Sequence, residues 1–292
     1  MNERKIYALG FFDGVHLGHQ ALLKACCQLA DAQGAVPAAI TFLRHPQALF
    51  RKNPPPLLSG EADRDRLLGQ YGIRHICKLP VTDKVMSTPW EEFLDYLLAD
   101  GAVGFVCGDD FRFGSRGEGN AQKLQTYCAS RNLPCVTVAE QLMDGVRISS
   151  THIRRLLEAG QVSRANVFLG HPHTITGQVV RGRQLGRTIG IPTANLELPD
   201  EILCPRHGVY ACRVLLENRQ LMAVTNVGTR PTVSGHHITV EPWILDFDGD
   251  LYGKTLTLEF YDFLRPEEKF DSLEALQTQI RQDAEKTRQL LG

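Results

Sequence analysis

Two histidines three residues apart, His16 and His19, stand in the turn Gly10–His19 near the start of the chain. A short apolar run, Ile6–Leu9, precedes this turn, and apolar residues at helical spacing follow from about Gly18. The turn therefore leads from a buried strand into a helix, where free backbone N–H groups can bind anions or nucleotides. Imidazoles titrate near neutrality, so both histidines could donate hydrogen bonds or carry positive charge towards a phosphoryl group. A tight turn with two surface histidines is the competing interpretation.

A second polar group, Ser149, Ser150, Thr151 and Arg154, opens a helix that is predicted to end at Gly160. One hydroxyl is explained as the N-cap of this helix. Three hydroxyls in a row followed by an arginine are more than a cap requires. Hydroxyls, free N–H groups and a guanidinium at one helix start predict an anion site for polyphosphate.

Two more polar loops follow predicted buried strands of the first half. They contain Arg44 and His45 after the strand at 38–42, and Asp110, Phe111 and Arg112 after the strand at 103–107. The first loop could touch a phosphate or be a plain polar turn. The second is glycine-rich and has two adjacent carboxylates, so it could bind phosphate or magnesium.

In the second half, a loop rich in glycine and arginine is suited to wrapping phosphates. It contains Gly182, Arg183, Gly186, Arg187 and Gly190, and it leads into Pro192. Thr193 and Asn195 follow and alternate across Ala194. In extended backbone both side chains would point to one face, where they could hold Mg²⁺ together with ATP oxygens. A polar hairpin is the alternative.

The turn at residues 10–19 resembles the bacterial bifunctional riboflavin kinase/FMN adenylyltransferase (FAD synthetase) family, whose form of the motif is G-x-F-D-G-V-H-x-G-H. The family's I-S-S-T-x-I-R motif matches residues 148–154, and its G-x-D-F-R-F-G motif matches residues 108–114. The riboflavin kinase signature G-R-x-x-G-x-P-T-A-N matches residues 186–195. The resemblance extends over nearly the whole chain, from Leu9 to Asp283.

The resemblance implies a role for each matching position. The residues expected to bind ATP for adenylyl transfer are Gly10, Phe12, Asp13, His16, Gly18, His19, Ser149, Ser150, Thr151 and Arg154, and those expected to bind flavin there are His45, Asp110, Phe111 and Arg112. The residues expected to bind ATP for the kinase are Gly182, Gly186, Arg187, Gly190, Pro192, Thr193 and Asn195, with Thr193 and Asn195 holding the metal. His16, His19 and Glu241 are the expected catalytic residues.

Glu241 stands where the family has its catalytic base, within the apolar run Ile238–Leu245. An unpaired carboxylate there would be costly without a functional reason, and an alcohol nucleophile needs a proton acceptor. Pro242 donates no hydrogen bond, so the strand is expected to lie at an edge or to be bulged there. Trp243 shares a strand face with Glu241, and it could pack against the flavin or fill the core.

The chain departs from the family pattern at several positions of the proposed sites. These are Phe11, where asparagine is common, Arg44, where proline is usual, and Arg116, which is shifted by one residue. In addition, Pro242-Trp243 follow Glu241, where the family usually continues from its base as E-x-H. The alternative that follows is a single-activity riboflavin kinase with an impaired adenylyltransferase domain.

The order of predicted elements indicates an α/β protein with two domains. Strands alternate with helices over residues 1–170. The resemblance implies that these residues form a Rossmann-like nucleotidylyltransferase domain with a parallel sheet, and that this domain is the FMN adenylyltransferase. Residues 171–292 contain short strand-like runs separated by turns, which predicts an antiparallel β-barrel, the riboflavin kinase domain. A terminal amphipathic helix follows. Its residues expected to face inward are Leu273, Leu276, Ile280 and Leu290.

Composition excludes several classes of protein. The formal net charge of −1 gives no basic excess for nucleic-acid binding, which disfavours a tRNA-related protein that shares H-x-G-H. No apolar run is long enough to span a bilayer and no signal peptide is visible, so a cytoplasmic protein without membrane partners is expected. The eight cysteines lack metal-site spacing and are expected to be buried free thiols.

The resemblance implies two ATP- and Mg²⁺-dependent reactions on small molecules. Riboflavin is phosphorylated to FMN in the C-terminal domain, and AMP is then transferred to FMN in the N-terminal domain, giving FAD and pyrophosphate. A flavin-binding protein without turnover is a further alternative, which the retention of His16, His19 and Glu241 disfavours. The sequence leaves the oligomeric state unknown.

Overall fold

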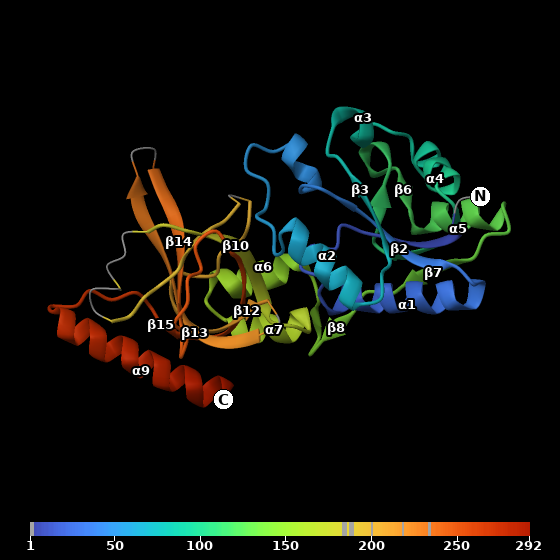
Figure 1. Cartoon of the computed structure of the whole chain (residues 1–292). Helices are drawn as coiled ribbons and strands as arrows, with labels where there is room; N and C mark the ends of the chain where they lie inside the picture. Colours follow the sequence, from blue (N-terminus) through green and yellow to red (C-terminus); the bar gives the residue numbers. More distant parts are fainter. Residues whose placement is uncertain (1–2, 183–185, 187–189, 200, 218, 233–234) are drawn as a thin grey trace. The chain divides into compact units, whose positions relative to one another are not determined.

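The computed structural model describes residues 3–182, 186, 190–199, 201–217, 219–232 and 235–292, with side chains for all of these except 230–232 and 235–237 (Figure 1). The chain forms two compact units. The first unit contains Met1–Leu57 and Arg64–Ser149, and the second contains Leu58–Asp63 and Ser150–Gly292. The units therefore divide before α6, which is earlier in the chain than the predicted domain boundary at residue 170.

A parallel sheet forms the centre of the first unit, in the order β3-β2-β1-β4-β7. Its strands are β1 (Lys5–Leu9), β2 (Val36–Phe42), β3 (His75–Leu79), β4 (Ala102–Gly108) and β7 (Cys135–Val138). The helices are α1 (Leu17–Gln33), α2 (Glu61–Gln70), α3 (Asp83–Met86), α4 (Trp90–Ala99) and α5 (Ala121–Ala129), with short 3₁₀ turns η1 (Pro46–Leu49) and η2 (Ser115–Gly117). Two short hairpins pair β5 (Arg112–Phe113) with β6 (Gly119–Asn120) and β8 (Leu142–Met143) with β9 (Val146–Arg147).

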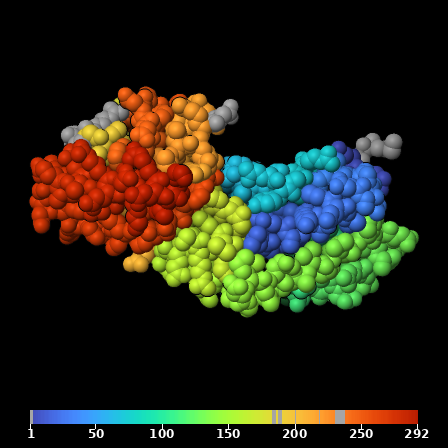
Figure 2. Space-filling model, turned by 90° about the horizontal axis from the view of Figure 1, so that it is seen from below, coloured from blue at the N-terminus to red at the C-terminus, as the bar shows by residue number. Residues whose placement is uncertain are grey.

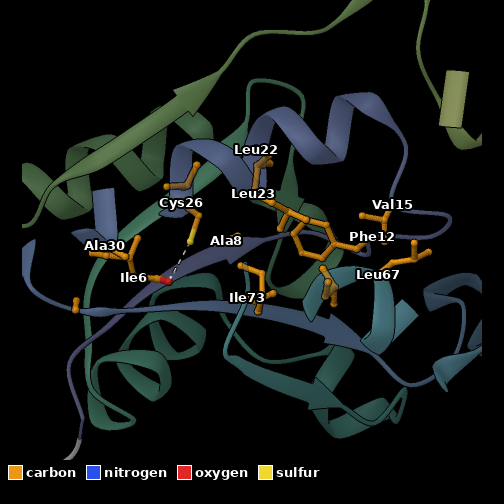
Figure 3. Close-up of a cluster of buried hydrophobic side chains, with 14 residues drawn as sticks. Ile6, Ala8, Phe12, Val15, Leu22, Leu23, Cys26, Ala30, Leu67 and Ile73 are labelled. Atoms are coloured by element: carbon orange, nitrogen blue, oxygen red, sulfur yellow. Dashed lines mark hydrogen bonds between the residues drawn. The ribbon is translucent and has the colours of Figure 1, made fainter. Parts of the chain in front are cut away.

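The two faces of this sheet are covered by different helices, because side chains along β1 alternate between them. Ile6 and Ala8 pack with apolar residues of α1 and α2, including Leu23 and Leu67 (Figure 3). Tyr7 and Leu9 pack on the opposite face with residues of α4 and α5. Both faces are buried, as a parallel sheet requires, and the predicted α/β domain is confirmed.

The second unit contains a closed antiparallel barrel in the order β10-β11-β14-β13-β12-β15. Its strands are β10 (His173–Val180), β11 (Asn195–Glu197), β12 (Gly208–Leu216), β13 (Arg219–Thr232), β14 (Gly235–Ile244) and β15 (Thr255–Arg265). The predicted antiparallel barrel is therefore confirmed. Helices α6 (Ser150–Glu158) and α7 (Val162–Leu169) precede it, and α9 (Leu273–Leu291) follows it.

Asn166 ties α7 to the barrel. Its side-chain amide donates to the carbonyl of Phe260 at 2.8 Å, and its side-chain oxygen accepts from the backbone N–H of His173 at 2.7 Å. These bonds are a physical reason why α7 belongs to the same compact unit as the barrel and not to the unit of the parallel sheet.

The terminal helix α9 packs against the barrel strands β12 and β13. In the space-filling view, the red C-terminal surface adjoins the orange surface of the barrel (Figure 2). The expectation that Leu273 and Leu290 face inward is wrong, because these side chains are 62% and 45% exposed. The buried positions of α9 are Asp283, Ala284 and Thr287.

The strand prediction around Pro242 also needs correction. β14 is not an edge strand, since it lies between β11 and β13, and its pairing with β13 runs through Pro242 without a bulge. The carbonyl of Pro242 accepts from the N–H of Ala194 at 2.9 Å. The proline nitrogen lies on that same side, at the end of the short ladder with β11, so the hydrogen bond that Pro242 cannot donate is missing only at the end of that ladder.

Elsewhere, the eight cysteines are free thiols, as predicted, but only four of them are buried, Cys26, Cys107, Cys128 and Cys212. In the described part of the chain, no helix is long and apolar enough to cross a bilayer.

Candidate active sites

The turn between β1 and α1 is held by apolar side chains at strained backbone positions. Phe12 and Val15 have positive φ angles of 56° and 38°, which side-chain-bearing residues rarely adopt. Both side chains are fully buried in the cluster of Figure 3. The hydroxyl of Thr41 on β2 also donates to the carbonyl of Phe11 at 2.7 Å. Core packing thus offsets a backbone conformation that costs about 1–3 kcal/mol per residue.

His16 forms the N-cap of α1. Its Nδ1 accepts a hydrogen bond from the backbone N–H of His19 at 3.3 Å, and the two imidazole rings stack with centroids 3.7 Å apart. Because Nδ1 is an acceptor, the proton of neutral His16 is on Nε2. A Cβ on Gly18 would lie 3.2 Å from the His16 ring, so this glycine leaves room for the cap.

Burial, and then the neighbouring His16, hold the pKa of His19 well below its ordinary value. His19 is therefore neutral at pH 7 in the ligand-free protein, and it acts there as a hydrogen-bond group rather than as a fixed cation. Its Nδ1 is buried and has no hydrogen-bond partner within the described residues. The structure thus brings His16 and His19 together at the start of α1, where free N–H groups also favour an anion.

The other residues that were predicted to bind ATP for adenylyl transfer are divided between the two units. Asp13 is buried in the turn, and a Cβ on Gly10 would lie 2.9 Å from the Phe12 ring. Ser149 is the last residue of the first unit, whereas Ser150, Thr151 and the buried Arg154 belong to α6 in the second.

A largely apolar cavity of about 250 Å³ lies where β1, β2 and β3 end. It is lined by residues that include Gly10, Phe11, Phe42, Pro46, Leu79, Met86, Phe93, Phe111, Arg112 and Phe113. Phe111 and Phe113 stack with ring centroids 5.7 Å apart. Two of the predicted flavin-binding residues, Phe111 and Arg112, are therefore part of one cavity.

The other two predicted flavin-binding residues are outside this lining. The carboxylate of Asp110 pairs with the guanidinium of Arg147. Nδ1 of His45 caps η1 by accepting from the N–H of Gln47 at 3.1 Å, and its ring meets Phe11 edge-on at 5.3 Å. His45 therefore contacts a wall of the cavity without lining it.

The departures from the family pattern lie at or near this cavity. The Phe11 ring lines it and also has the guanidinium of Arg64 at 5.1 Å from its centroid. Arg44 is exposed to solvent. Arg116 has a φ of 53° and lines a neighbouring cavity of about 690 Å³. None of the three side chains fills the 250 Å³ space.

In the barrel, Glu241 and Trp243 lie two residues apart on β14 and line one cavity of about 310 Å³. The shared face predicted from their alternation is thus confirmed. Thr193 and Asn226 line the same cavity, with Asn226 directly opposite Glu241 on β13. The remaining lining residues are Ile191, Val209, Val224, Arg265, Glu267, Glu268, Phe270, Leu276, Ile280 and Asp283.

A second barrel cavity, of about 200 Å³, shares Thr193 with the first. Its other lining residues are Val179, Pro192, Ala194, Pro242, Ile244, Phe247, Asp248, Gly249, Asp250, Leu251 and Tyr252. Thr193 is thus a residue that both cavities share, while Glu241 and Trp243 line the first and the alternating Pro242 and Ile244 line the second.

Glycines bring the loop before Thr193 close to its neighbours. A Cβ on Gly182 would lie 2.3 Å from the side-chain amide of Asn195, and a Cβ on Gly186 would lie 2.1 Å from the carbonyl of Ile191. Gly190 has a φ of 69°. Predicted Arg187 lies outside the described residues.

Thr193 and Asn195 offer a hydroxyl and an amide oxygen, which are the donor types that Mg²⁺ accepts. In the described part of the chain, no cluster of three His, Cys, Asp or Glu side chains could hold a metal alone. Mg²⁺ usually keeps waters and substrate phosphates as ligands, so a sparse set of protein oxygens fits this ion.

Sequence reasoning missed the part that α9 plays in the barrel cavity. Leu276 and Ile280, which were expected to face inward, line it. Asp283 also lines it, together with Arg265, its partner in a bidentate ion pair. The available signal was an acidic residue at position 283 on the same helical stripe as Leu276 and Ile280.

Comparisons with known proteins match both units. A family model for FAD synthetase matches residues 1–152, and one for riboflavin kinase matches residues 169–291. Three relatives are named bifunctional riboflavin kinase/FMN adenylyltransferase. The protein from Listeria monocytogenes is 34% identical to this chain, and the match covers 97% of this chain and 91% of that protein. The proteins from Pseudomonas fluorescens and Escherichia coli K12 are each 35% identical; the matches cover 98% and 99% of this chain, and 92% and 94% of those proteins, respectively. A crystal structure described as a macrolide-efflux protein from Streptococcus pneumoniae is 32% identical, with a TM-score of 0.89, over 99% of this chain and 95% of that one.

Proposed function

This chain belongs to the bifunctional riboflavin kinase/FMN adenylyltransferase family, and we propose that each of its two parts carries one of the two reactions. The enzyme phosphorylates riboflavin to FMN with ATP and adenylylates FMN to FAD with release of pyrophosphate. We assign the first reaction to residues 171–292 and the second to residues 1–170. A single-activity kinase is not favoured, since both family models match.

The observation that carries the kinase assignment is that Thr193 lines two barrel cavities, one of which is also lined by Glu241. The larger, mostly apolar cavity takes riboflavin, with Trp243 and Phe270 as aromatic walls. The smaller cavity takes ATP. The γ-phosphate then lies near Thr193, and the riboflavin hydroxyl lies near Glu241.

In this arrangement the riboflavin oxygen attacks the γ-phosphorus, the bond to the bridging oxygen of ADP breaks, and Glu241 accepts the hydroxyl proton. Thr193 and Asn195 are the residues that would hold Mg²⁺, which supplies charge neutralisation to the ATP phosphates. Gly182, Gly186 and Gly190 let the preceding backbone approach those phosphates. Arg187 and Pro192 remain assigned to the ATP site as predictions.

For adenylyl transfer, we propose that ATP binds at the start of α1 and FMN in the 250 Å³ cavity. The FMN phosphate oxygen attacks the α-phosphorus of ATP and pyrophosphate leaves. The nucleophile is already an anion, so no strong base is required. His16 and His19 position the phosphates and donate hydrogen bonds as charge develops, together with N–H groups of the helix terminus.

Several assignments for adenylyl transfer remain predictions from the family pattern. For ATP binding they are Gly10, Phe12, Asp13, Gly18, Ser149, Ser150, Thr151 and Arg154. For flavin binding they are His45, Asp110, Phe111 and Arg112. We also propose that the enzyme acts in the cytoplasm on small molecules alone, because both reactions consume ATP and the net charge of −1 does not favour nucleic acid.

The test is incubation of the full chain with riboflavin, ATP and Mg²⁺, with riboflavin, FMN and FAD separated over time. FMN should appear first and FAD after it. When Mg²⁺ is left out and a chelator is added, both steps should stop. Accumulation of FMN without FAD, also when FMN is supplied directly, would contradict the adenylyltransferase assignment.

The division of labour is tested with fragments. Residues 171–292 should convert riboflavin to FMN and stop there. A longer fragment, residues 150–292, should be more stable, because it keeps the two hydrogen bonds of Asn166 to the barrel. If neither fragment phosphorylates riboflavin while the full chain does, the kinase domain does not function independently of the first part of the chain.

A further inference from the structure

The terminal helix α9 is attached to the barrel in an unusual manner for an amphipathic helix. Helices of this kind normally bury a stripe of large apolar side chains. In α9, the buried positions are instead Asp283, Ala284 and Thr287. The larger apolar side chains Leu276 and Ile280 are only partly buried and line the 310 Å³ cavity.

An ion pair holds the middle of this helix. Nε of Arg265 donates to both carboxylate oxygens of Asp283, at 3.1 and 3.0 Å, and Nη2 donates to Oδ2 at 2.8 Å. The Asp283 side chain is 4% exposed and that of Arg265 is 14% exposed. Gln279 adds a third donor to the carboxylate at 3.1 Å. Arg265 is the last residue of β15, so the pair joins the helix directly to a barrel strand.

The pair also fixes which side of α9 faces the cavity. Leu276, Ile280 and Asp283 are spaced four and three residues apart, so they lie on one stripe of the helix. A planar guanidinium that engages both oxygens of a carboxylate restricts distance and rotation together, which a single charge contact does not. Arg265 further lies with its guanidinium 5.6 Å from the ring centroid of Phe270, another residue that lines the cavity.

We propose that Arg265 and Asp283 are a positioning pair that sets the affinity of the kinase for riboflavin. By locking the rotation of α9, they hold Leu276 and Ile280 as a preformed apolar wall of the riboflavin site. The pair does not take part in phosphoryl transfer. This inference rests on the proposed assignment of riboflavin to the 310 Å³ cavity.

The chain provides a matched control on the same helix. Nη2 of Arg288 donates to both oxygens of Asp246, at 3.1 and 3.2 Å. This pair also ties α9 to the barrel side, but it is exposed to solvent and neither residue lines the cavity. Arg288→Gln therefore removes an attachment of α9 without changing a cavity residue.

The experiment compares Asp283→Asn, Arg265→Lys and Arg288→Gln in the full chain. For each we would measure kcat, the KM for riboflavin, the KM for ATP, and the Kd for riboflavin from quenching of its fluorescence. Asp283→Asn should raise the riboflavin KM and Kd at least tenfold, with kcat and the ATP KM within threefold of wild type. Arg265→Lys, which keeps the charge but not the fork, should give a smaller rise, and Arg288→Gln should change the riboflavin constants less than twofold.

Two results would overturn the inference. One is an unchanged riboflavin KM and Kd in folded Asp283→Asn. The other is a similar change of all kinetic constants in Asp283→Asn and Arg288→Gln, which would mean general loosening of the helix. If Asp283→Asn does not fold, Arg265→Lys with the same measurements decides. Failure of the proposed function would be distinct, since the wild-type chain would then neither bind nor phosphorylate riboflavin.

Discussion

In the first unit, His16 and His19 are placed by a turn and the first residues of a helix, whereas in the second unit Glu241 is placed by the register of a barrel strand. The histidines are neighbours in sequence, and their cap and ring stacking are local. Glu241 is instead opposite Asn226, fifteen residues earlier, and shares its cavity with the distant Thr193.

The difference determines what each site tolerates. A local site depends on a few backbone angles, so a small change within the turn can displace both imidazoles. A register-based site depends on many ladder hydrogen bonds, so single side chains can be exchanged there without moving the backbone. The following predictions, from the largest effect to the smallest, examine this contrast.

The largest effect is expected for Glu241→Gln. The side chains have nearly equal volume, so the barrel should stay folded while the kinase loses its proton acceptor. Riboflavin phosphorylation should fall by about 10²- to 10⁴-fold, and conversion of supplied FMN to FAD should continue, as measured by separate assays of the two steps. Asp246→Asn is the control. If that variant abolishes the kinase while Glu241→Gln does not, the base has been assigned to the wrong carboxylate.

For the turn, His19→Ala should slow FAD formation from FMN by about 10²- to 10³-fold, because one preorganised hydrogen-bond donor is lost. Riboflavin phosphorylation should be unchanged. His75→Ala, at the start of β3, removes a half-exposed histidine from the same unit and should leave both rates near wild type. FAD synthesis within tenfold of the wild-type rate in His19→Ala would contradict the assignment of that histidine.

The barrel should also respond to acid through His173. Burial lowers the pKa of this imidazole to about 4, and its Nε2 has no hydrogen-bond partner within the described residues. The imidazole binds a proton at about pH 6.5 in the unfolded chain, but only at about pH 4 in the folded chain. The contribution of His173 to the free energy of unfolding is therefore fully present above pH 6.5 and is lost as the pH falls towards 4. The loss should reach about 2 kcal/mol between pH 7 and pH 5.

The two tryptophans make this measurement specific to each unit. With Trp90→Phe, the remaining Trp243 reports unfolding of the barrel by fluorescence. In that background, His173→Phe should flatten the dependence of the unfolding free energy on pH by about the same 2 kcal/mol. An unchanged slope would show that His173 does not titrate in this way.

The smallest effect is expected for Gly18→Ala. The new Cβ would lie 3.2 Å from the His16 ring, so the cap must shift by a few tenths of an ångström. We expect FAD formation to slow by about tenfold, within the loss known for small misplacements of catalytic groups, with the kinase unchanged. Gly69→Ala in α2, whose Cβ would meet nothing within 4 Å, is the matched control. Equal effects of the two variants would remove the distinction between a sensitive turn and an ordinary helix.

The same contrast explains how much could be predicted from the sequence. The turn with His16 and His19 was predictable because its strand, loop and helix start are contiguous, and its motif is a local pattern. The shared face of Glu241 and Trp243 followed from the period of two in a strand. The cavities themselves were not predictable, since they depend on which distant strands pair and in what register.

The orientation of α9 is the clearest failure. Leucine periodicity suggested that Leu273 and Leu290 would be buried. The helix is instead held by the ion pair of Asp283 with Arg265, which lies outside the helix at the end of strand β15. Hydrophobic periodicity cannot reveal an ionic partner outside the helix. The pairing of Asp110 with Arg147, 37 residues later, escaped prediction for the same reason.

The shared border at Thr193 has a consequence for inhibitor design. Because this residue lines both barrel cavities, one compound could join a flavin-like group in the larger cavity to an adenosine-like group in the smaller one. The second group would then bind at the high effective concentration set by the linker, and the combined affinity could exceed that of either group by about 10²- to 10⁴-fold. Under the proposed assignment of riboflavin and ATP to these cavities, a linker that passes Thr193 would occupy the path of the transferred phosphoryl group, so such a compound would block both substrates of the kinase at once.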